Sequence, residues 1–229
     1  AGMAVIKDPE TGTRNMSYHR QQILGPDRSG FLICPRHALR TYQKYQALTQ
    51  PMPVAMVIGV HPAILYAGGF TTRYGIDELS LAGGLLEDPV RLVKCETSDL
   101  EVPADAELII EGEILPDEMT EEGPFGEVTG GYAEEGSTEV FVVKAITHRK
   151  DPIFYGMHSG APMTDPQSIT GTCIEAALFE HLAKVEGGMD LSDVRCLGVS
   201  GLMAVIIKIR PKSAGQAKTA LMAALSSPY

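Results

Sequence analysis

Two glutamates bracket a short, stiff stretch in the middle of the chain, Glu122-Gly-Pro-Phe-Gly-Glu127. Pro124 fixes its own φ and lacks a backbone donor, whereas Gly126 allows backbone conformations that other residues resist. We therefore expect a turn rather than a helix or a regular strand, and a turn can bring both carboxylates into one cavity. Carboxylates held close together repel each other, which separates their pKa values and suits them to proton transfer. The alternative is a surface loop with two solvated acids.

A second cluster, Asn15-Met-Ser-Tyr-His-Arg20, places an amide, two hydroxyls, an imidazole and a guanidinium on one expected strand. Arg20 is suited to hold a carboxylate through a two-pronged contact, because its guanidinium presents a planar fork of donors. The alternative is a solvated edge strand whose charges belong to a hairpin.

Two further groups are candidates for binding an ion or a phosphate. His37 follows Pro35 and Arg36 at the expected start of a helix, where free N–H groups favour anions and a His can also ligate a metal. The segment Ala67-Gly-Gly-Phe70 precedes Glu78, and its glycines let a ligand approach the backbone closely. The alternatives are an ordinary surface His and, for Glu78, an acid that stabilises the first turn of a helix.

Standard motifs for zinc, for phosphate-binding loops, for dinucleotide-binding fingers and for nucleophile elbows do not occur in this sequence. An Asn, a His and a Glu far apart in sequence would still suit a hard cation, Mg²⁺ or Mn²⁺ rather than Zn²⁺. A cofactor phosphate would be a natural further ligand of such an ion.

The elements that must position these groups fall into two parts. Residues 1–155 are expected to be mostly β with short helices, and residues 156–229 to be α/β, with a boundary near residues 158–170. Apolar runs and turn residues predict strands at 4–7, 15–24, 31–34, 53–60, 91–95, 107–114, 139–148, 193–199 and 202–210. Helical patterns are expected at 36–47, 62–67, 76–86, 165–185 and 213–225. Residues 15–34 are expected to form a hairpin.

Composition argues against several classes of partner. The chain has 229 residues, 44% of them hydrophobic, so it can bury a core. A net charge of −10 argues against nucleic acid or an anionic membrane as a main partner. Apolar runs fall short of the ~18 residues of a membrane span. Four widely spaced Cys without a C-x-x-C motif predict reduced thiols in a cytoplasmic protein. Because the chain opens within an expected strand and stops directly after an expected helix, we expect it to be part of a longer polypeptide.

Together these pieces resemble the UbiD family of decarboxylases over most of the chain. The resemblance rests on their order and spacing, and the central loop with its two glutamates is the most specific piece. The matching pieces are Asn15-x4-Arg20, Pro35-Arg-His37, Asp77-Glu78 before Ala82-Gly-Gly84, Val93-Lys-Cys-Glu-Thr97 with Leu100-Glu-Val-Pro-Ala104, Ile110-Glu-Gly-Glu113 and Glu122-Gly-Pro-Phe-Gly-Glu127.

The resemblance implies an α+β fold that binds prenylated FMN. A split β-barrel of flavin-reductase type with short helices would occupy residues 1–158, and a linker helix with the start of a C-terminal α/β domain would occupy residues 159–229. It further implies Mn²⁺ (or Mg²⁺) and K⁺ between the protein and the flavin phosphate. The residues carried over are Asn15, His37 and Glu78 for the metal, backbone oxygens at Met16 and Ala67 for K⁺, and Ser17, Tyr18, Arg36, Gly68, Gly69 and Phe70 for the flavin.

The activity that the resemblance implies is a non-oxidative, reversible decarboxylation of an aromatic or α,β-unsaturated carboxylic acid. Arg20, Glu122 and Glu127 carry over as its catalytic network. Arg20 would orient the carboxylate, Glu127 would deliver a proton to the carbon that lost CO₂, and Glu122 would tune that acid. The implied partners are the small carboxylic acid, a flavin prenyltransferase that supplies the cofactor, and further copies of the chain in a homo-oligomer.

Two other functions remain open at this stage. The chain can be a non-catalytic flavin-domain subunit, or a truncated paralogue, that assembles with a partner chain. The paired acids alone would also suit a glycosidase-like hydrolase. That function leaves Asn15, His37 and Arg20 without a role, and the sequence has no Trp to form a sugar platform.

Overall fold

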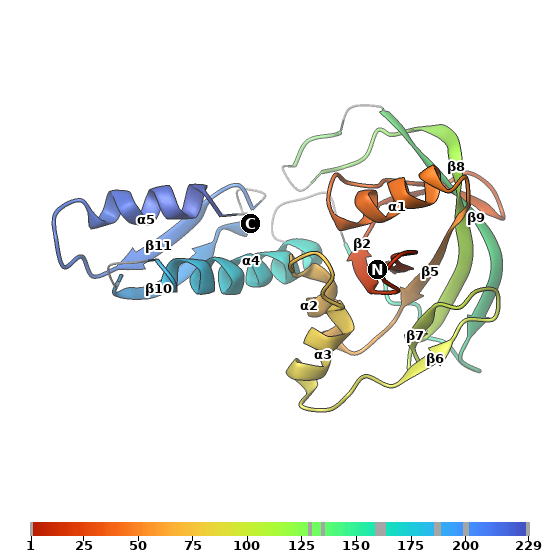
Figure 1. Cartoon of the computed structure of the whole chain (residues 1–229), viewed down its shortest axis with the longest axis horizontal. Helices are drawn as coiled ribbons and strands as arrows, with labels where there is room; N and C mark the ends of the chain where they lie inside the picture. The colour runs from red at the N-terminus through yellow and green to blue at the C-terminus, as the bar shows by residue number, and fades with distance from the viewer. Residues whose placement is uncertain are drawn as a thin grey trace. The chain divides into compact units, whose positions relative to one another are not determined.

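The computed structural model of the chain describes residues 2–127, 130–133, 136–158, 164–185, 189–198 and 202–227. Their internal contacts divide the chain into two compact units (Figure 1). The first comprises Ala1–Pro124 and Ala133–Gly156, and the second comprises Phe125–Tyr132 and Met157–Tyr229. The domain boundary predicted between residues 158 and 159 stays a prediction.

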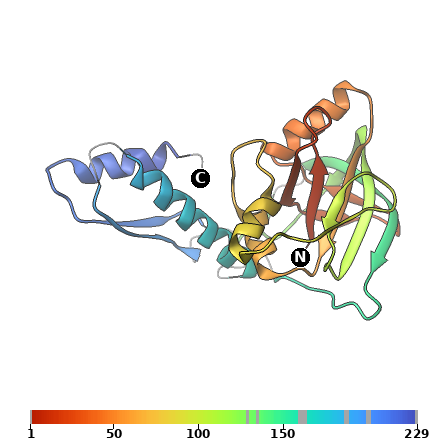
Figure 2. The same cartoon turned by 60° about the horizontal axis from the view of Figure 1, so that its bottom comes forward.

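A seven-stranded antiparallel sheet forms the first unit, in the order β2-β1-β5-β8-β9-β4-β3. Figures 1 and 2 show its long strands β8 and β9 curling around the unit. The strands of the sheet are β1 (Gly2–Lys7), β2 (Arg14–Tyr18), β3 (Gln21–Ile23), β4 (Arg28–Phe31), β5 (Met52–Ile58), β8 (Leu108–Glu122) and β9 (Gly136–His148).

The two edge strands of this sheet, β2 and β3, are consecutive in the chain and are separated only by His19 and Arg20. The Cα atoms of Tyr18 and Gln21 can therefore be at most ~11 Å apart. The sheet must curl until its edges almost meet, as in a barrel left open along one seam. Directly beside this junction the N–H of Leu32 donates to the carbonyl of Arg20 at 3.0 Å, which continues the ladder between β3 and β4 by one residue pair. His19 and Arg20 thus lie where the barrel closes.

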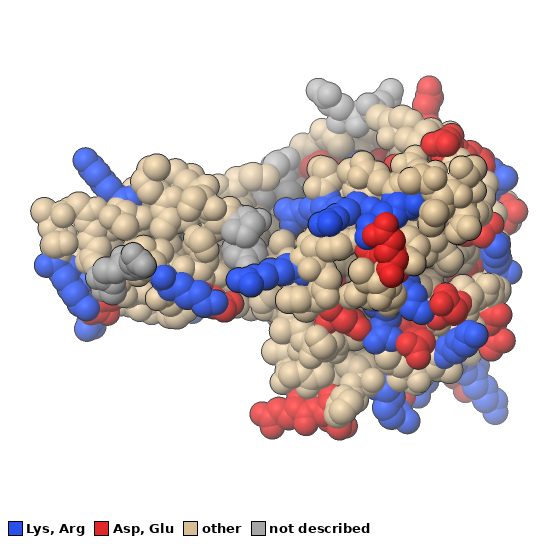
Figure 3. Space-filling view, in the orientation of Figure 1, with Lys and Arg blue, Asp and Glu red and all other residues tan. Residues whose placement is uncertain are grey.

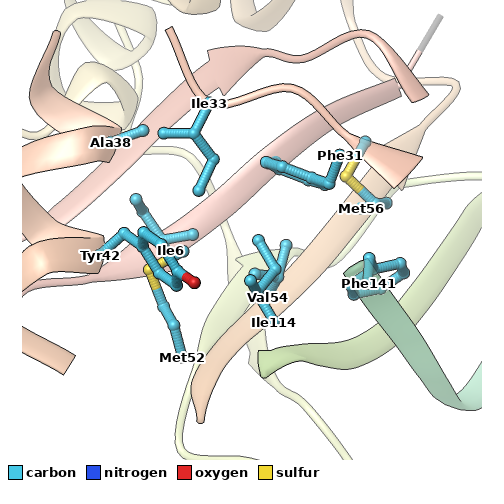
Figure 4. Packing of buried hydrophobic residues seen from close by; sticks show 11 residues of the cluster. Ile6, Phe31, Ile33, Ala38, Tyr42, Met52, Val54, Met56, Ile114 and Phe141 are labelled. Carbon is cyan, nitrogen blue, oxygen red and sulfur yellow. The ribbon is translucent and has the colours of Figure 1, made fainter. Parts of the chain in front are cut away.

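The core of the first unit fills the inside of the curled sheet. Ile6 on β1, Val54 on β5, Ile114 on β8 and Phe141 on β9 gather there and are nearly inaccessible to water (Figure 4). Of the strands that supply them, β1 and β5 have continuous apolar runs and are buried on both faces, whereas β8 and β9 also have exposed residues. Burial of these side chains stabilises the curl of the sheet, at ~1.5–3 kcal/mol for each large apolar side chain.

Two short helices pack beside the sheet. The helix α1 (His37–Ala47) contributes the buried Tyr42 to the core, and the Tyr42 hydroxyl donates to the carbonyl of Leu115. The helix α2 (Pro62–Gly69) begins with His61, whose ring accepts the N–H of Ala63 at 3.2 Å. His61, which has no role in the family resemblance, is therefore a helix cap.

The start of the helix α3 (Glu78–Leu86) is fixed by Asp77. One carboxylate oxygen of Asp77 accepts the N–H of Leu79 at 3.0 Å, as the side chain of an N-cap residue does. The other accepts from Nε and Nη2 of Arg14 on β2, at 2.9 and 2.7 Å. Because Arg14 holds the cap, the first residue of the helix is held against β2.

A small ribbon of β6 (Leu92–Lys94) and β7 (Glu101–Pro103) is tied to the main sheet by Glu111 of β8. The carboxylate of Glu111 accepts the N–H groups of Glu96 and Thr97 at 3.0 and 2.7 Å, and the Thr97 hydroxyl at 2.7 Å. Burial alone would raise the pKa of Glu111, but these hydrogen bonds outweigh it and the pKa lies below its usual value. Glu111 therefore serves as a buried anchor for the turn between β6 and β7.

The second unit pairs two helices with a two-stranded antiparallel sheet. Its core contains Leu178 and Leu182 of α4 and Val194 of β10, with Ala223 of α5 packed against them. The elements of this unit are α4 (Asp165–Ala183), β10 (Leu191–Cys196), β11 (Val205–Ile209) and α5 (Gln216–Leu225).

The predicted α+β fold, a barrel-like sheet with short helices followed by an α/β unit, is confirmed. The predicted hairpin over residues 15–34 is wrong. Only β3 and β4 form a hairpin, whereas β2 pairs with β1. The expected strand over residues 15–24 is broken at His19 and Arg20, because the chain crosses there from one edge of the sheet to the other.

The strand predicted at 107–114 is also longer than expected. β8 continues past an irregular register between Ile114 and Met119 and ends at Glu122. Glu122 is therefore the last residue of a strand, and the turn is confined to the residues after it. The Gly123–Pro124 peptide bond in this turn is cis.

No helix in the described part of the chain combines the length and the apolar character needed to cross a membrane. All four cysteines are free thiols.

We predict that Gly112→Ala destabilises the first unit. A Cβ at this position would lie 2.1 Å from the carbonyl oxygen of Val142 and 2.8 Å from ring atoms of Phe141. We expect the free energy of unfolding in urea to fall by about 1–3 kcal/mol. The matched control is Gly84→Ala, at an exposed position in α3 where a Cβ would meet nothing within 4 Å. This control should be neutral or stabilising by up to about 1 kcal/mol, so equal losses in both variants would contradict the prediction.

Candidate active site

Arg20 and Glu122 form a two-pronged ion pair at the barrel seam. Nη2 of Arg20 lies 2.7 Å from Oε2 of Glu122, and Nε lies 3.3 Å from Oε1. The Glu122 side chain is 3% exposed and that of Arg20 is 25% exposed. A buried carboxylate without a partner would be strongly destabilising, and the guanidinium of Arg20 is such a partner for Glu122. The seam and the end of β8 bring together residues that lie 102 positions apart.

The loop after Glu122 is also held by a side chain of β3, the strand that follows Arg20. The side-chain oxygen of Gln22 on β3 accepts the N–H of Gly123 at 3.2 Å. Arg20 and Gln22 are two residues apart along the strand, so their side chains project to the same face. The start of the loop is therefore fixed by two side chains.

Glu127 stands at a tight turn of its own. Its N–H donates to the carbonyl of Gly131 at 2.8 Å, its carbonyl accepts the N–H of Gly130 at 2.9 Å, and Gly126 bridges to Tyr132. These residues belong to the second compact unit, whereas Arg20 and Glu122 belong to the first. The structure thus pairs Arg20 with Glu122, and the convergence of Glu127 on that pair stays a prediction.

A third acid, Glu139 on β9, is coupled electrostatically to Glu122 and has no role in the family resemblance. Burial raises the pKa of Glu139, and the charge of Glu122 raises it further. The backbone N–H of Ile33 opposes this shift by donating to Glu139. Glu139 is therefore another acid that interacts electrostatically with Glu122.

Asn15 and Glu78, two of the three predicted metal ligands, are in direct contact. Nδ2 of Asn15 donates to Oε1 of Glu78 at 3.0 Å, and the N–H of Met16 donates to Oε2 at 2.7 Å. The hydroxyl of Thr72 completes the set at 3.1 Å from Oε1. Glu78 is 2% exposed, and burial raises its pKa despite these donors. Among the described residues, no Lys or Arg forms an ion pair with it.

His37, the third predicted ligand, lines the same small pocket as Asn15, together with Asp8 and Tyr74. The pocket has a volume of ≈ 10 Å³, close to the ~10–15 Å³ that one water needs. Burial lowers the pKa of His37, and the charges of Arg36 and Arg40 lower it further. A neutral ring with a free lone pair is the form that ligates a metal.

The described residues contain no group of three His, Cys, Asp or Glu side chains that could hold a metal, so a cation at Asn15, His37 and Glu78 stays a prediction that rests on the chemistry of these donors. Glu78 is a buried carboxylate without a cationic side chain beside it, and burying such a charge is costly unless it is compensated. Asn and Glu oxygens with one His nitrogen are the ligands of a hard ion such as Mn²⁺ or Mg²⁺.

Tyr74 orders the His37 side of this pocket and was not assigned a role from the sequence. Its ring meets the His37 ring edge-on at 5.4 Å, and the Arg40 guanidinium lies 4.0 Å above its face. Its hydroxyl donates to the buried Asp8, which also accepts from Lys44 at 2.7 Å. Burial would raise the pKa of Asp8, but the hydrogen bonds from Lys44 and Tyr74 hold it well below its usual range.

The predicted flavin-binding side chains lie around β2 and α2. The Tyr18 hydroxyl donates to the carbonyl of Leu65 at 2.9 Å, and Ser17 lies 2.9 Å from a ring nitrogen of His19. Arg36 donates to the hydroxyl of Thr71 at 2.9 Å. Arg36 flanks α1, and in Figure 3 Lys and Arg side chains gather over the part of the first unit where Figure 1 places this helix. The positive charge of this surface suits a phosphate.

The residues predicted for K⁺ and the flavin backbone contacts cluster at the end of α2. A Cβ on Gly68 would lie 2.6 Å from Sδ of Met3 and 3.6 Å from Cε of Met16, so packing already requires Gly at this position. The carbonyl of Ala67 accepts the N–H of Phe70 at 3.2 Å, beyond Gly69. Met16, Ala67 and Gly68 are thus neighbours, and their ligand roles stay predictions.

Comparison with known proteins agrees with these features. A family model described as UbiD, 3-octaprenyl-4-hydroxybenzoate carboxy-lyase Rift-related domain, matches residues 1–162. The chain therefore belongs to the UbiD family.

Several relatives share nearly the whole chain. It is 32% identical to a phenolic acid decarboxylase of Bacillus subtilis (strain 168), covering 98% of this chain and 47% of that protein. An evolved dimeric form of the UbiD-class enzyme HmfF from Pelotomaculum thermopropionicum, in complex with prFMN, superposes with a TM-score of 0.93 at 39% identity, covering 98% of this chain and 52% of that one. The closed form of Sedimentibacter hydroxybenzoicus vanillic acid decarboxylase superposes with a TM-score of 0.89 at 29% identity, covering 99% and 48%. The chain spans about half the length of these relatives.

We predict that the Arg20–Glu122 pair behaves as a buried unit. Arg20→Ala should lower the free energy of unfolding by about 3–5 kcal/mol, because it leaves the charge of Glu122 buried without this partner. Adding Glu122→Gln should restore part of that loss, which a double-mutant cycle in urea measures. The control is Arg91→Ala, which breaks a two-pronged but exposed pair with Asp105 and should cost less than about 1 kcal/mol. Equal costs for Arg20→Ala and Arg91→Ala would show that burial does not strengthen the pair.

Proposed function

We propose that this chain is the flavin-binding part of a prenylated-FMN-dependent decarboxylase, which removes CO₂ reversibly from an aromatic or α,β-unsaturated carboxylic acid. The observation that carries the proposal is the buried Glu122 held by both prongs of Arg20, in a chain whose relatives include decarboxylases of phenolic and vanillic acids. The planar fork of donors on a guanidinium is the geometry with which proteins bind carboxylates.

The proposed cofactor is prenylated FMN with Mn²⁺ (or Mg²⁺) and K⁺. Asn15, His37 and Glu78 would hold the divalent ion, and backbone oxygens at Met16 and Ala67 would hold K⁺. The cluster of cations around Arg36 supports a phosphate beside them. Side chains of Ser17, Tyr18 and Arg36, with the backbone of Gly68, Gly69 and Phe70, would line the flavin. When bound, the extended flavin ring accepts the electron pair that is left when CO₂ departs.

The residues of this chain would bind the acid and move one proton. Arg20 binds the carboxylate of the substrate and orients the side chains of Glu122 and Glu127. Glu127 holds a proton and gives it to the carbon from which CO₂ has left, and in the reverse direction it takes that proton back. Glu122 would be the paired acid that tunes Glu127 for this transfer.

The proposed partners and cellular location follow from the proposed decarboxylase activity. A flavin prenyltransferase would supply the cofactor, and the dimeric HmfF relative supports a homo-oligomer. Free thiols at all four Cys support a reducing, cytoplasmic location.

We expect Glu127→Gln to abolish CO₂ release while flavin binding is retained. The loss of a general acid should lower the rate by about 10²–10⁴-fold. The measurement is CO₂ release from a panel of aromatic and unsaturated acids by the full-length polypeptide, produced together with a flavin prenyltransferase. Glu121→Gln, an exposed neighbour on β8, is the control and should keep wild-type activity. Full activity in a flavin-loaded Glu127→Gln protein would refute the assignment, and a flavin-loaded wild type without activity would favour a non-catalytic subunit.

We also expect Glu78→Gln to weaken Mn²⁺ binding, because it removes the buried charge that the ion would neutralise. The affinity of the flavin-free, full-length polypeptide for Mn²⁺, measured from the electron paramagnetic resonance signal of the free ion, should fall by about tenfold or more. Glu96→Gln, an exposed acid outside the set, should leave the affinity unchanged. Unchanged affinity in Glu78→Gln would remove Glu78 from the metal set.

A further inference from the structure

His19 is a partly buried imidazole at the barrel seam to which the proposed mechanism gives no task. Its ring stacks on Phe31, with centroids 4.6 Å apart and planes 26° apart. Nδ1 lies 2.9 Å from the carbonyl oxygen of Leu32, and Nε2 lies 2.9 Å from Oγ of Ser17. His19 therefore joins the strand end after β4 to β2, across the seam.

These contacts determine where the hydrogens lie. A carbonyl oxygen only accepts, so Nδ1 of His19 must carry the hydrogen that it donates to Leu32. Burial lowers the pKa of His19, which favours the neutral ring, and a neutral ring with a hydrogen on Nδ1 has a lone pair on Nε2. The Ser17 hydroxyl must then donate its single hydrogen to His19.

The same hydroxyl lies beside the candidate metal ligand. Oγ of Ser17 is 3.5 Å from Oδ1 of Asn15, and among the described residues no other donor bonds that oxygen. Nδ2 of Asn15 is committed to Glu78 at 3.0 Å, so the amide is oriented with Oδ1 as its free acceptor. Asn15 and Ser17 alternate along β2 and share a face, and the His19 ring, just beyond the end of the strand, lies 2.9 Å from Ser17, which places the three polar groups in a row.

We propose that His19 is a positioning residue that keeps the Ser17 hydrogen away from Asn15, so that Oδ1 of Asn15 stays available to a divalent cation. If Nε2 is removed, the Ser17 hydroxyl turns and donates to one of the two lone pairs of Oδ1, which weakens this oxygen as a ligand of the ion. The inference rests on the proposed metal set of Asn15, His37 and Glu78. It assigns to His19 a task within that site that the family resemblance does not supply.

The test is a double-mutant cycle on Mn²⁺ affinity in the flavin-free, full-length polypeptide, with Mn²⁺ alone as the probe. His19→Phe keeps the stacking on Phe31 but removes the acceptor, and should weaken binding about tenfold, as loss of a partner of a metal ligand typically does. Ser17→Ala should bind nearly as the wild type. The double variant should regain most of the lost affinity, because the misdirected hydrogen is gone.

The sign of the coupling between His19→Phe and Ser17→Ala distinguishes a positioning role of His19 from a general loss of structure. A structural role for His19 predicts that the double variant binds as weakly as His19→Phe alone, and that result would overturn the inference. Wild-type affinity in His19→Phe would overturn it as well. Glu78→Gln in the same titration distinguishes the two levels: if it loses Mn²⁺ while His19→Phe does not, the metal set stands and only the role of His19 fails.

A second measurement covers the case in which His19→Phe does not fold. Long-range ¹H–¹⁵N spectra of the wild-type polypeptide, labelled at histidine, report which ring nitrogen of His19 carries the hydrogen. We expect the Nδ1–H tautomer, with an Nε2 resonance that shifts in Ser17→Ala because its hydrogen bond is lost. An Nε2–H tautomer would overturn the inference.

Discussion

The closure of the curled sheet at His19 and Arg20 is the constraint on which the candidate site depends. β2 and β3 occupy opposite edges of the seven-stranded sheet but are joined by only these two residues. The covalent chain itself therefore joins the two edge strands of the sheet, with only His19 and Arg20 between them. Core packing by Phe31, Phe141 and their neighbours stabilises the curl of the sheet. The short connection between β2 and β3 determines that His19 and Arg20 are the side chains at the seam.

The same short connection explains why the candidate metal ligands lie near the Arg20–Glu122 pair. Six consecutive residues, from Asn15 to Arg20, lead from the metal-ligand candidates to the Arg20–Glu122 pair. An extended segment of that length spans at most ~20 Å. The proposed metal ligand Asn15 and the proposed substrate-binding Arg20 therefore lie at the two ends of one short segment.

Much of this was predictable from the sequence, and the failures have a common physical cause. The apolar runs of β1 and β5, the turn residues and the amphipathic helices depend on nearby residues, so local patterns located them. The hairpin over residues 15–34 was wrong because local alternation cannot show that His19 and Arg20 cross between sheet edges, which is a property of the whole barrel. The length of β8 beyond Ile114 was missed for the same reason, since its pairing with β9 and not its composition extends it to Glu122. In the site, the family resemblance grouped Arg20 with Glu122 and Asn15 with Glu78, whereas Tyr74, Asp8 and Glu139 act through partners that are distant in sequence. Gln22 alone left a local signal, because it stands two residues after Arg20 in the chain.

Two buried glutamates of the first unit, Glu78 and Glu111, differ in how their charge is compensated. Glu78 and Glu111 are both 2% exposed, and each accepts three hydrogen bonds from main-chain and side-chain donors. In Glu111 the donors outweigh burial, so the pKa falls below its usual value and the carboxylate is satisfied within the chain. In Glu78 burial outweighs the donors and the pKa rises, so the charged form remains under-stabilised. Neither carboxylate has a Lys or Arg among these partners, so the direction of each pKa shift follows from the balance between burial and hydrogen bonds. The metal is proposed at Glu78 and not at Glu111 because Glu78 is in contact with Asn15, another proposed ligand, whereas Glu111 is occupied by Glu96 and Thr97 in the turn between β6 and β7.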